Sequence, residues 1–571
     1  MALGHPQRPA NPPAAPGRWR ASLAIDDLSW LVWLIPFGLA AIYGVIFVVQ
    51  LPHNLWVLNW NADYTSGFTV PETLVKTGTG GDTVLGTTGG YVALWFGLLT
   101  ASLPLHRELW EIGPTLLFIA TALVVGWSVA QVTDRRVAAF AALLILVASP
   151  RALYIFMAPV PHNTVVYPCT ALLGAYLIWL IRTAGRKRST VFAVALPAGI
   201  VLGACIASDS LVIATGVIPF VFAALLIGAQ RGQQPKWAAA GALTTAVVAV
   251  PIAKLTSSMM GSLGYVTIAP TTVIASLSEL PRHGELIWEG LKGLLNGYLT
   301  QTAPSGFHPV LGVACEIIIV AALVTLLVVG IRTTGKLIWS GLRRDVQTKP
   351  TQLVASSHIV YWAGSATATA GSWALSIRIE YVHEAYYATL VFSIAAVLAL
   401  LMRSRATTRW LVSACASIFF LASIVGLTNY YMESYVLPIA RSYMGKATYV
   451  PPIAHYQSEI TSFAKANHVV VGYAGYGDAP TLTWSSREQV VVRPVQVCRN
   501  PGGVDLCPFF LERVPSWYEP RRRRTFLLVD STEAFLPALP PGLGQPLAVE
   551  SFGPLQMYVY PYDIASRIGP L

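Results

Sequence analysis

Apolar runs of about 20 residues recur along the first three quarters of the chain. A helix of that length crosses the roughly 30 Å hydrocarbon core of a bilayer. Hydrophobic residues make up 54% of the 571 residues and charged residues only 11%, whereas about a quarter of the residues in a soluble domain are charged. The pattern therefore predicts an α-helical polytopic membrane protein.

About eleven transmembrane helices are predicted from these runs. They cover approximately residues 28–50, 113–132, 137–148, 164–181, the two runs that flank 208–210, 237–255, a run ending near 332, 353–372, 387–402 and 410–430. The apolar segment 89–105 is short and is bounded by a Gly pair and Pro104. An interfacial or re-entrant helix is expected there.

Lys and Arg account for the net charge of +11 and cluster in short loops between the apolar runs. The clusters lie at 134–136, 182–188, 231, 336–349 and 403–409. A cytoplasmic N-terminus and an odd number of crossings place all of them on the inner face, as the positive-inside rule requires. We therefore expect a multi-pass plasma-membrane protein whose C-terminus is extracytoplasmic. No RNA- or DNA-binding motif appears, and nucleic acid is not an expected partner.

The domain organisation follows from shifts in composition. Residues 1–27 are rich in Pro and Ala and are predicted to be a disordered cytoplasmic tail. Residues 28–432 form the transmembrane core, with long outer loops at 51–112 and 256–308. Residues 433–571 alternate β-rich runs with Gly/Pro turns and include a helical pattern near 453–467, which predicts an extracytoplasmic α/β domain.

Two cysteines support an oxidising location for that domain. Cys498 and Cys507 flank an Asn-Pro-Gly-Gly turn, a spacing that favours a disulfide closing a hairpin-like loop; the alternative is two free thiols. The other four cysteines lie in apolar runs and are expected to pack there. No CxxC motif or His/Cys cluster indicates zinc, and no cofactor is indicated.

Charged groups near membrane depth are the candidates for chemistry. Asp63 follows the first helix in the sequence NWNADYTSGF, where it is either a general base or a helix-capping or Asx-turn residue, the latter favoured by the local sequence alone. Glu72 follows Pro71 at an expected helix start, where a carboxylate complements the helix dipole. Asp82 in GTGGDTVLG has the pattern of a turn residue.

A second group lies in the outer loop SIRIEYVHEAYY, which contains Arg378, Tyr381, His383 and Glu384. Arginine suits a phosphate because it donates two parallel hydrogen bonds. An equally supported interpretation is a surface pair between Arg378 and Glu380 beside interfacial tyrosines.

Further candidates are isolated. His162 and Asn163 open the fourth predicted span, as site residues or as a wetted helix start. Lys254 ends the seventh span, where it holds an anionic headgroup or snorkels to the interface. The run of four arginines at 521–524 is interpreted as a solvated face, with an anionic lipid head or glycan as the alternative.

The arrangement resembles the GT-C superfamily of integral membrane glycosyltransferases, in particular the actinobacterial cell-envelope members that use polyprenyl-phosphate-linked sugars. The resemblance rests on Asp63 in NWNADYTSGF, on Arg378 with Tyr381 and His383 before a late helix, and on the C-terminal extracytoplasmic domain. It implies inverting transfer of a sugar to an envelope glycan or lipid acceptor, with Asp63 as base. The paired-acid pattern of some members is absent because Tyr64 follows Asp63, which leaves a divalent metal requirement open.

The same resemblance assigns the remaining residues. Arg378, with His383 or Lys254, would bind the donor phosphate, and the loop at 256–308, with Arg282 and Glu285, would contribute to the acceptor cleft. Membrane lipids would surround the core. Two other functions remain open: a transporter or flippase of a lipid-linked sugar, although no internal repeat is seen, and a non-catalytic envelope scaffold.

Overall fold

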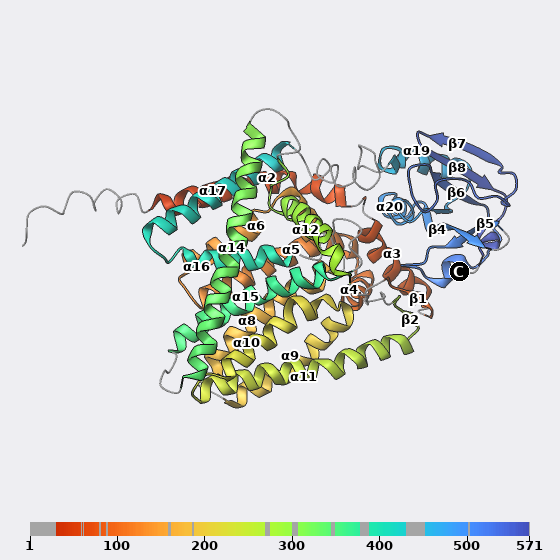
Figure 1. Cartoon of the computed structure of the whole chain (residues 1–571). Helices are drawn as coiled ribbons and strands as arrows, with labels where there is room; N and C mark the ends of the chain where they lie inside the picture. The colour runs from red at the N-terminus through yellow and green to blue at the C-terminus, as the bar shows by residue number, and fades with distance from the viewer. Residues whose placement is uncertain are drawn as a thin grey trace, which may run out of the picture.

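A computed structural model describes residues 30–58, 60, 62–78, 81–86, 90–157, 162–184, 188–268, 275–299, 307–343, 349–376, 388–429, 452–500 and 503–569. Figure 1 shows a bundle of long helices with a smaller sheet domain, formed by the C-terminal part of the chain, at one end. The predicted tail at 1–27 lies outside the described residues.

Within the described residues, seven helices are long and apolar enough to cross a membrane. They are α2 (Leu31–Leu58), α5 (His106–Ala130), α8 (Tyr167–Ala184) with the π-helical turn η1 (His162–Val166), α9 (Arg188–Ser208), α11 (Gln233–Ser262), α14 (Phe307–Leu342) and α17 (Ala406–Asn429). An eighth span results if α6 (Arg135–Leu146) and α7 (Pro150–Met157), which are bent by 90°, count as one. The multi-pass helical fold is thus confirmed.

The count of eleven stays a prediction. The other predicted spans coincide with α10 (Ile218–Gly228) after the π-helical turn η2 (Ile213–Val217), with α15 (Pro350–Ala374) and with α16 (Thr389–Leu401). α10 and α16 are apolar but short. α15 carries the buried polar residues Ser357, His358 and Thr369, so it is less apolar than a lipid-facing helix. α4 (Tyr91–Ala101), in the expected interfacial segment, has 11 residues and extends only about 16 Å.

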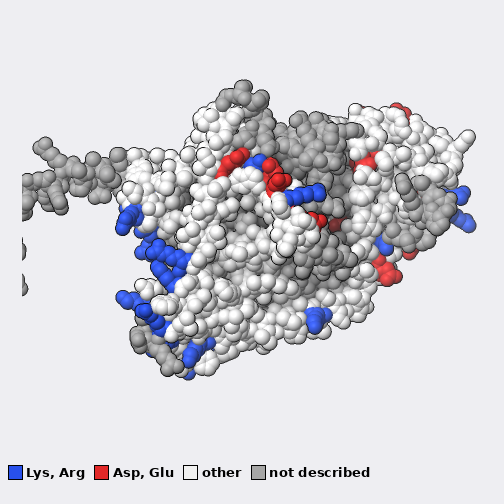
Figure 2. Space-filling view, in the orientation of Figure 1, with Lys and Arg blue, Asp and Glu red and all other residues white. Residues whose placement is uncertain are grey.

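Basic residues mark one end of the bundle. Figure 2 shows Lys and Arg gathered at the end opposite the sheet domain. The basic loops before α6 and before α17 lie next to each other, since the Arg403 guanidinium donates to the Val132 carbonyl at 3.2 Å. Since basic loops stay in the cytoplasm, the distribution is consistent with an extracytoplasmic sheet domain.

The break between α6 and α7 is stabilised by polar side chains. The Ser149 hydroxyl donates to the Gly293 carbonyl at 2.9 Å and accepts from the Ala152 N–H at 3.0 Å. The Ser423 hydroxyl donates to the Val147 carbonyl at 3.3 Å. Non-helical backbone at membrane depth is tolerated where such partners replace the lost helical bonds. The break turns α7 across the bundle, against α12 (Leu280–Leu294).

The sheet domain contains six strands in the order β5-β4-β3-β6-β8-β7. They are β3 (Val471–Ala474), β4 (Val491–Asn500), β5 (Gly503–Pro508), β6 (Thr525–Asp530), β7 (Ala548–Phe552) and β8 (Leu555–Tyr560). β3 is parallel to β4 and β6, and the remaining pairs are antiparallel. The helices α19 (Pro452–Ala466) and α20 (Ala479–Ser485) pack on this sheet, and α19 matches the helix predicted near 453–467.

Gly472 in β3 is required by close packing. A β-carbon at this position would lie 2.3 Å from the ring of Phe526 in the neighbouring strand. The Phe526 ring is fully buried and belongs to the core between the sheet and α19. Any side chain at 472 would displace this ring, so the central strand pair depends on glycine there.

The predicted disulfide between Cys498 and Cys507 is present. It joins the antiparallel strands β4 and β5, which pair from Val495 opposite Pro508 to Asn500 opposite Gly503. The bond therefore closes a short hairpin, as the spacing indicated.

Replacing both hairpin cysteines with serine is expected to destabilise the sheet domain by about 2–3 kcal/mol, because the bond restricts a short loop in the unfolded chain. Denaturant unfolding of the full chain, compared between the double variant and the oxidised wild type, measures the change in the free energy of unfolding. Reduction of the wild type should reproduce it, and Cys415→Ser, at a free cysteine of α17, should not. Equal stability of the double variant and the wild type would contradict the expectation.

Candidate functional site

The helix α3 (Ala62–Thr77) joins the bundle to the sheet domain. Its Ser66 hydroxyl donates to Glu512, which also accepts from the Tyr476 hydroxyl. The Trp517 indole N–H donates to the Thr73 hydroxyl at 3.1 Å. α3 therefore binds the sheet domain with polar contacts along one side.

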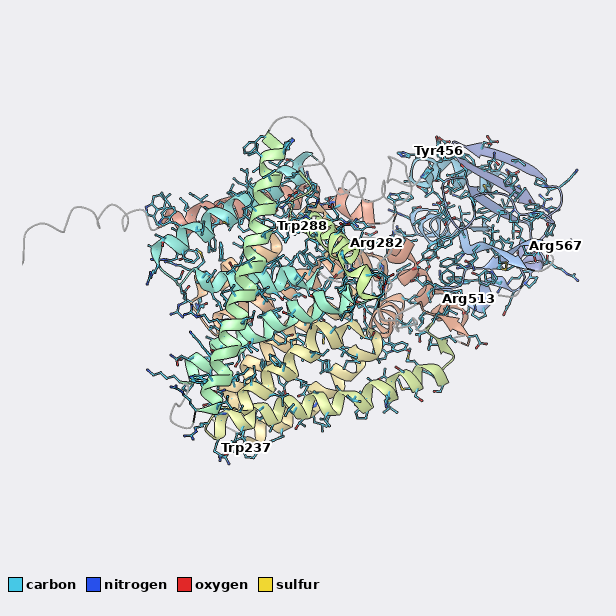
Figure 3. The ribbon with its side chains drawn as sticks, viewed as in Figure 1. Trp237, Arg282, Trp288, Tyr456, Arg513 and Arg567 are labelled. Atoms are coloured by element: carbon cyan, nitrogen blue, oxygen red, sulfur yellow. A yellow bond between two sulfur atoms is a disulfide. The ribbon has the colours of Figure 1, made fainter. Side chains whose placement is uncertain are left out.

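A short strand reinforces this junction. β1 (Thr83–Val84) pairs in parallel with β2 (Tyr265–Val266), which follows α11. On its other side the Val84 N–H donates to the Arg513 carbonyl at 2.9 Å, and the Arg513 N–H donates to the Val84 carbonyl at 3.0 Å. Figure 3 shows Arg513 at the side of the sheet domain that faces the bundle. The first outer loop thus ties α11 to the domain.

A cleft of about 770 Å³ opens beside α3, between the start of α5 and the sheet domain. The residues that line it are Trp60, Phe68, Glu72, Lys76, His106, Arg107, Glu108, Glu111, Gln457, Ser485, Arg487 and Glu488. Phe68, Glu72 and Lys76 recur at helical spacing and so share one face of α3. The cleft combines charged groups with aromatic rings.

Two carboxyl groups and a lysine meet inside the cleft. Lys76 Nζ lies 2.8 Å from Glu72 Oε1 and 2.5 Å from Glu488 Oε2, and His106 Nε2 lies 3.8 Å from Glu72 Oε1. Burial and the contact with Glu488 raise the pKa of Glu72 to about 7. Although its own burial opposes the change, contacts with Glu72 and Lys76 lower the pKa of Glu488. A carboxyl that titrates near neutrality is suited to accept or donate a proton.

Aromatic packing fixes the walls of the cleft. Trp484 of α20 is buried, and its ring lies 4.5 Å from that of Phe68 in an edge-to-face arrangement. The Arg107 guanidinium lies 4.1 Å from the Trp484 ring centroid. The Phe68 ring also stacks on the His106 ring, with 4.9 Å between the ring centroids. Aromatic faces beside carboxyl and guanidinium groups can bind the apolar faces and hydroxyls of a sugar.

Of the residues singled out in the first outer loop, the structure brings Glu72 into the cleft. The expected helix start at Glu72 is wrong, because α3 begins at Ala62 and continues through Pro71. Asp63 lies in the first turn of α3, and its side chain is outside the described ones. Asp82 is exposed, with a φ of 57°, in the turn before β1. It has the turn conformation that its sequence predicts and does not line the cleft.

The other predicted residues are dispersed or not described. Arg378, Tyr381, His383, Glu384 and the side chain of His162 lie outside the described residues. Asn163 is buried and donates to the Ile155 carbonyl of α7. Lys254 is exposed on α11, and Arg282 and Glu285 are exposed on α12. Figure 3 shows Arg282 closer than Trp288 to the sheet domain.

Sequence reasoning missed several residues of the site. Glu488 and Trp484 lie in the sheet domain, and no local pattern relates them to α3; Lys76 and Glu488, for example, are 412 residues apart. Arg151 of α7 and Lys292 of α12 do not line the cleft and are not among the predicted site residues, yet each is only 8% exposed. The sequence could have identified both residues, because a charged residue next to an apolar run is a functional candidate.

No protein-family model matches the chain, and no curated protein shows a significant match to it.

Proposed function

We propose that the protein is an inverting glycosyltransferase that acts at the outer face of the plasma membrane. It would transfer a sugar from a polyprenyl-phosphate donor to an envelope glycan or glycolipid. The observation that carries the proposal is the cleft between α3 and the disulfide-bonded domain, with a carboxyl whose pKa lies near 7. A cleft at the junction of the helix bundle and the sheet domain supports the proposal, because a membrane-bound donor and an external acceptor could both reach it.

The proposed chemistry requires a base and a cation. The acceptor hydroxyl attacks the anomeric carbon while its proton passes to a carboxylate. The bond from that carbon to the phosphate oxygen breaks, and its electron pair remains on the polyprenyl phosphate. Cations at that oxygen stabilise the transition state. A phosphate leaving group already activates the sugar, so no nucleotide is consumed.

Two carboxyl groups of α3 are candidates for the base. Asp63 follows from the resemblance to GT-C enzymes, and Glu72 from its place in the cleft and its raised pKa. Positions 63 and 72 are about two and a half helical turns apart, so they fall on opposite sides of α3. They are therefore separate candidates, which single substitutions can distinguish.

Arg151 and Lys292 are proposed to assist at the phosphate, in addition to Arg378 and His383. Both are buried where α7 turns across the bundle against α12. The hydrogen bond from Ser149 to the Gly293 carbonyl holds these two elements together. The Lys292 ammonium lies 2.7 Å from Glu289, and the Arg151 guanidinium lies 5.5 Å from the Tyr154 ring centroid.

Binding of the shared leaving group tests the proposal before the sugar is known. A long-chain polyprenyl phosphate at about a hundredfold excess over its dissociation constant should stabilise the folded protein by about 2.7 kcal/mol, measured by thermal unfolding. Arg151→Gln should weaken the stabilisation, whereas Arg282→Gln, at an exposed arginine of α12, should not. If polyprenyl phosphate stabilises the wild type no more than the uncharged polyprenol does, the transferase proposal fails.

Turnover of a screened donor then identifies the base. Loss of a general base lowers the rate by about 10²–10⁴-fold, so Asp63→Asn or Glu72→Gln should show this loss, and Asp82→Asn should retain activity. A base with a pKa of about 7 must be deprotonated, so with Glu72 in this role the rate rises with pH through about 7 and Glu72→Gln abolishes that limb. A Glu72→Gln variant with full activity and an unchanged pH profile would leave Asp63 as the base.

A further inference from the structure

The loop before β6 carries four consecutive arginines, Arg521–Arg524, and borders a second concavity. Its volume is about 480 Å³, and the lining residues are Pro520, Arg521, Arg522, Arg523, Arg524, Pro561, Tyr562, Asp563 and Ser566. The concavity is formed by two loops of the sheet domain, one before β6 and one after β8. It is separate from the cleft beside α3.

A buried carboxylate holds the arginine loop in place. Asp563 Oδ2 accepts from the Arg523 Nε at 2.9 Å and from the Arg521 N–H at 3.2 Å. Its Oδ1 accepts from the Tyr473 hydroxyl at 2.9 Å and from the Ala565 N–H at 3.1 Å. The loop is thus anchored to the central strand β3 through Asp563 and Tyr473.

The anchoring leaves a surplus of positive charge at the surface. Arg521, Arg522 and Arg524 are exposed, and Asp563 forms its side-chain ion pair with Arg523. The exposed Arg567 adds a further guanidinium 5.8 Å from the Tyr562 ring centroid. Several guanidinium groups around one concavity favour a ligand that carries several anionic groups.

The position of this surface separates it from the bilayer. Figure 3 shows Arg567 at the side of the sheet domain that faces away from the helix bundle. At physiological ionic strength the field of lipid headgroups decays within about 8 Å. Headgroups of the protein's own membrane are therefore poorly placed to bind here, whereas a polymer outside the membrane is well placed.

We propose that Arg521, Arg522, Arg524 and Arg567, around the concavity anchored by Asp563, form a binding site for an anionic glycan polymer of the cell envelope. The recognised chemistry is a repeat of phosphate or carboxylate groups along a chain. Such a site would hold the sheet domain on the envelope polymer. This inference is independent of the transferase proposal and holds for a scaffold or a transporter as well.

Binding to defined polymers tests the site. The full chain in nanodiscs of neutral lipid is titrated with inorganic polyphosphate, with polygalacturonate and with uncharged dextran. We expect salt-sensitive binding to at least one of the two anionic polymers and none to dextran. The variant Arg521→Ser/Arg522→Ser/Arg524→Ser, which keeps the pair between Arg523 and Asp563, should bind at least about tenfold more weakly.

A matched variant distinguishes binding at this local site from binding that depends only on the net charge of the protein. Arg135→Ser/Arg231→Ser/Arg405→Ser removes the same charge from exposed positions at the opposite end of the bundle and should bind like the wild type. Equal loss in both variants, or no loss in the loop variant, would overturn the proposal. Stronger binding of the wild type to anionic lipid nanodiscs or to RNA than to either polymer, abolished by the loop variant, would assign the surface to that ligand instead.

Discussion

Replacing Asp563 with alanine is expected to destabilise the sheet domain by about 3–5 kcal/mol, because the buried Tyr473 hydroxyl, two backbone N–H groups and a partly exposed guanidinium all lose their acceptor. Asp563 is 3% exposed and accepts from Tyr473, Arg523 and two backbone N–H groups. Tyr473 lies in the central strand β3, so the loss extends from the loop into the core of the sheet.

Hydrogen exchange of the full chain measures this effect where it arises. Amides of β6 and β8 should exchange roughly 100-fold faster or more in Asp563→Ala, since each 1.4 kcal/mol changes an opening equilibrium tenfold. Glu550→Ala, at an exposed carboxylate of β7 in the same domain, is the matched control and should stay within about 0.5 kcal/mol of wild type. Unchanged exchange in β6 and β8 would show that the Asp563 network does not stabilise the sheet.

Trp484→Ala is expected to weaken the junction between the bundle and the sheet domain by about 3–5 kcal/mol, the usual effect of deleting a buried aromatic side chain. The Trp484 ring packs against Phe68 and lies under the Arg107 guanidinium, so it joins α20 to α3 and to α5. Phe68 and Arg107 also line the cleft, directly in front of this ring. Its geometry should therefore change together with the junction.

Amide hydrogen exchange distinguishes a weaker junction between the bundle and the sheet domain from unfolding of the sheet domain itself. In Trp484→Ala the amides of α3 should exchange faster, whereas those of β6 and β8, remote from the junction, should change less. Trp339→Ala removes an exposed tryptophan of α14 and should leave both regions unchanged. Equal protection of α3 in Trp484→Ala and wild type would mean that the polar contacts of Ser66 and Thr73 hold the junction without this ring.

Local patterns were sufficient for much of the fold. Runs of about 20 apolar residues predicted spans now seen in α2, α5 and α14, since the length that crosses a bilayer is a property of one segment. The β-rich runs predicted within residues 433–571 include the strand β6, and the spacing of Cys498 and Cys507 predicted the disulfide. Each of these patterns is local and extends over about 20 residues or fewer.

The count of spans was harder to derive. α15 is long but carries buried polar residues, and α6 and α7 are separated by a bend of 90°. Whether such a segment crosses the membrane depends on partners in other helices, such as Ser423 of α17 at the break. Hydropathy along the chain does not record those partners.

The sequence by itself determined which regions suit lipid and which suit water: the long apolar helices have the length and hydropathy of membrane spans, and the cystine-bearing domain has a composition consistent with an extracytoplasmic location. Only the tertiary structure decided which carboxyl group has a raised pKa. Glu72 has the local pattern of an ordinary helix-start residue, yet burial beside Glu488, which the fold brings from the far end of the chain, raises its pKa to about 7. The physical reason is that hydropathy and turn preference act along neighbouring residues, whereas desolvation and charge coupling depend on distances in space.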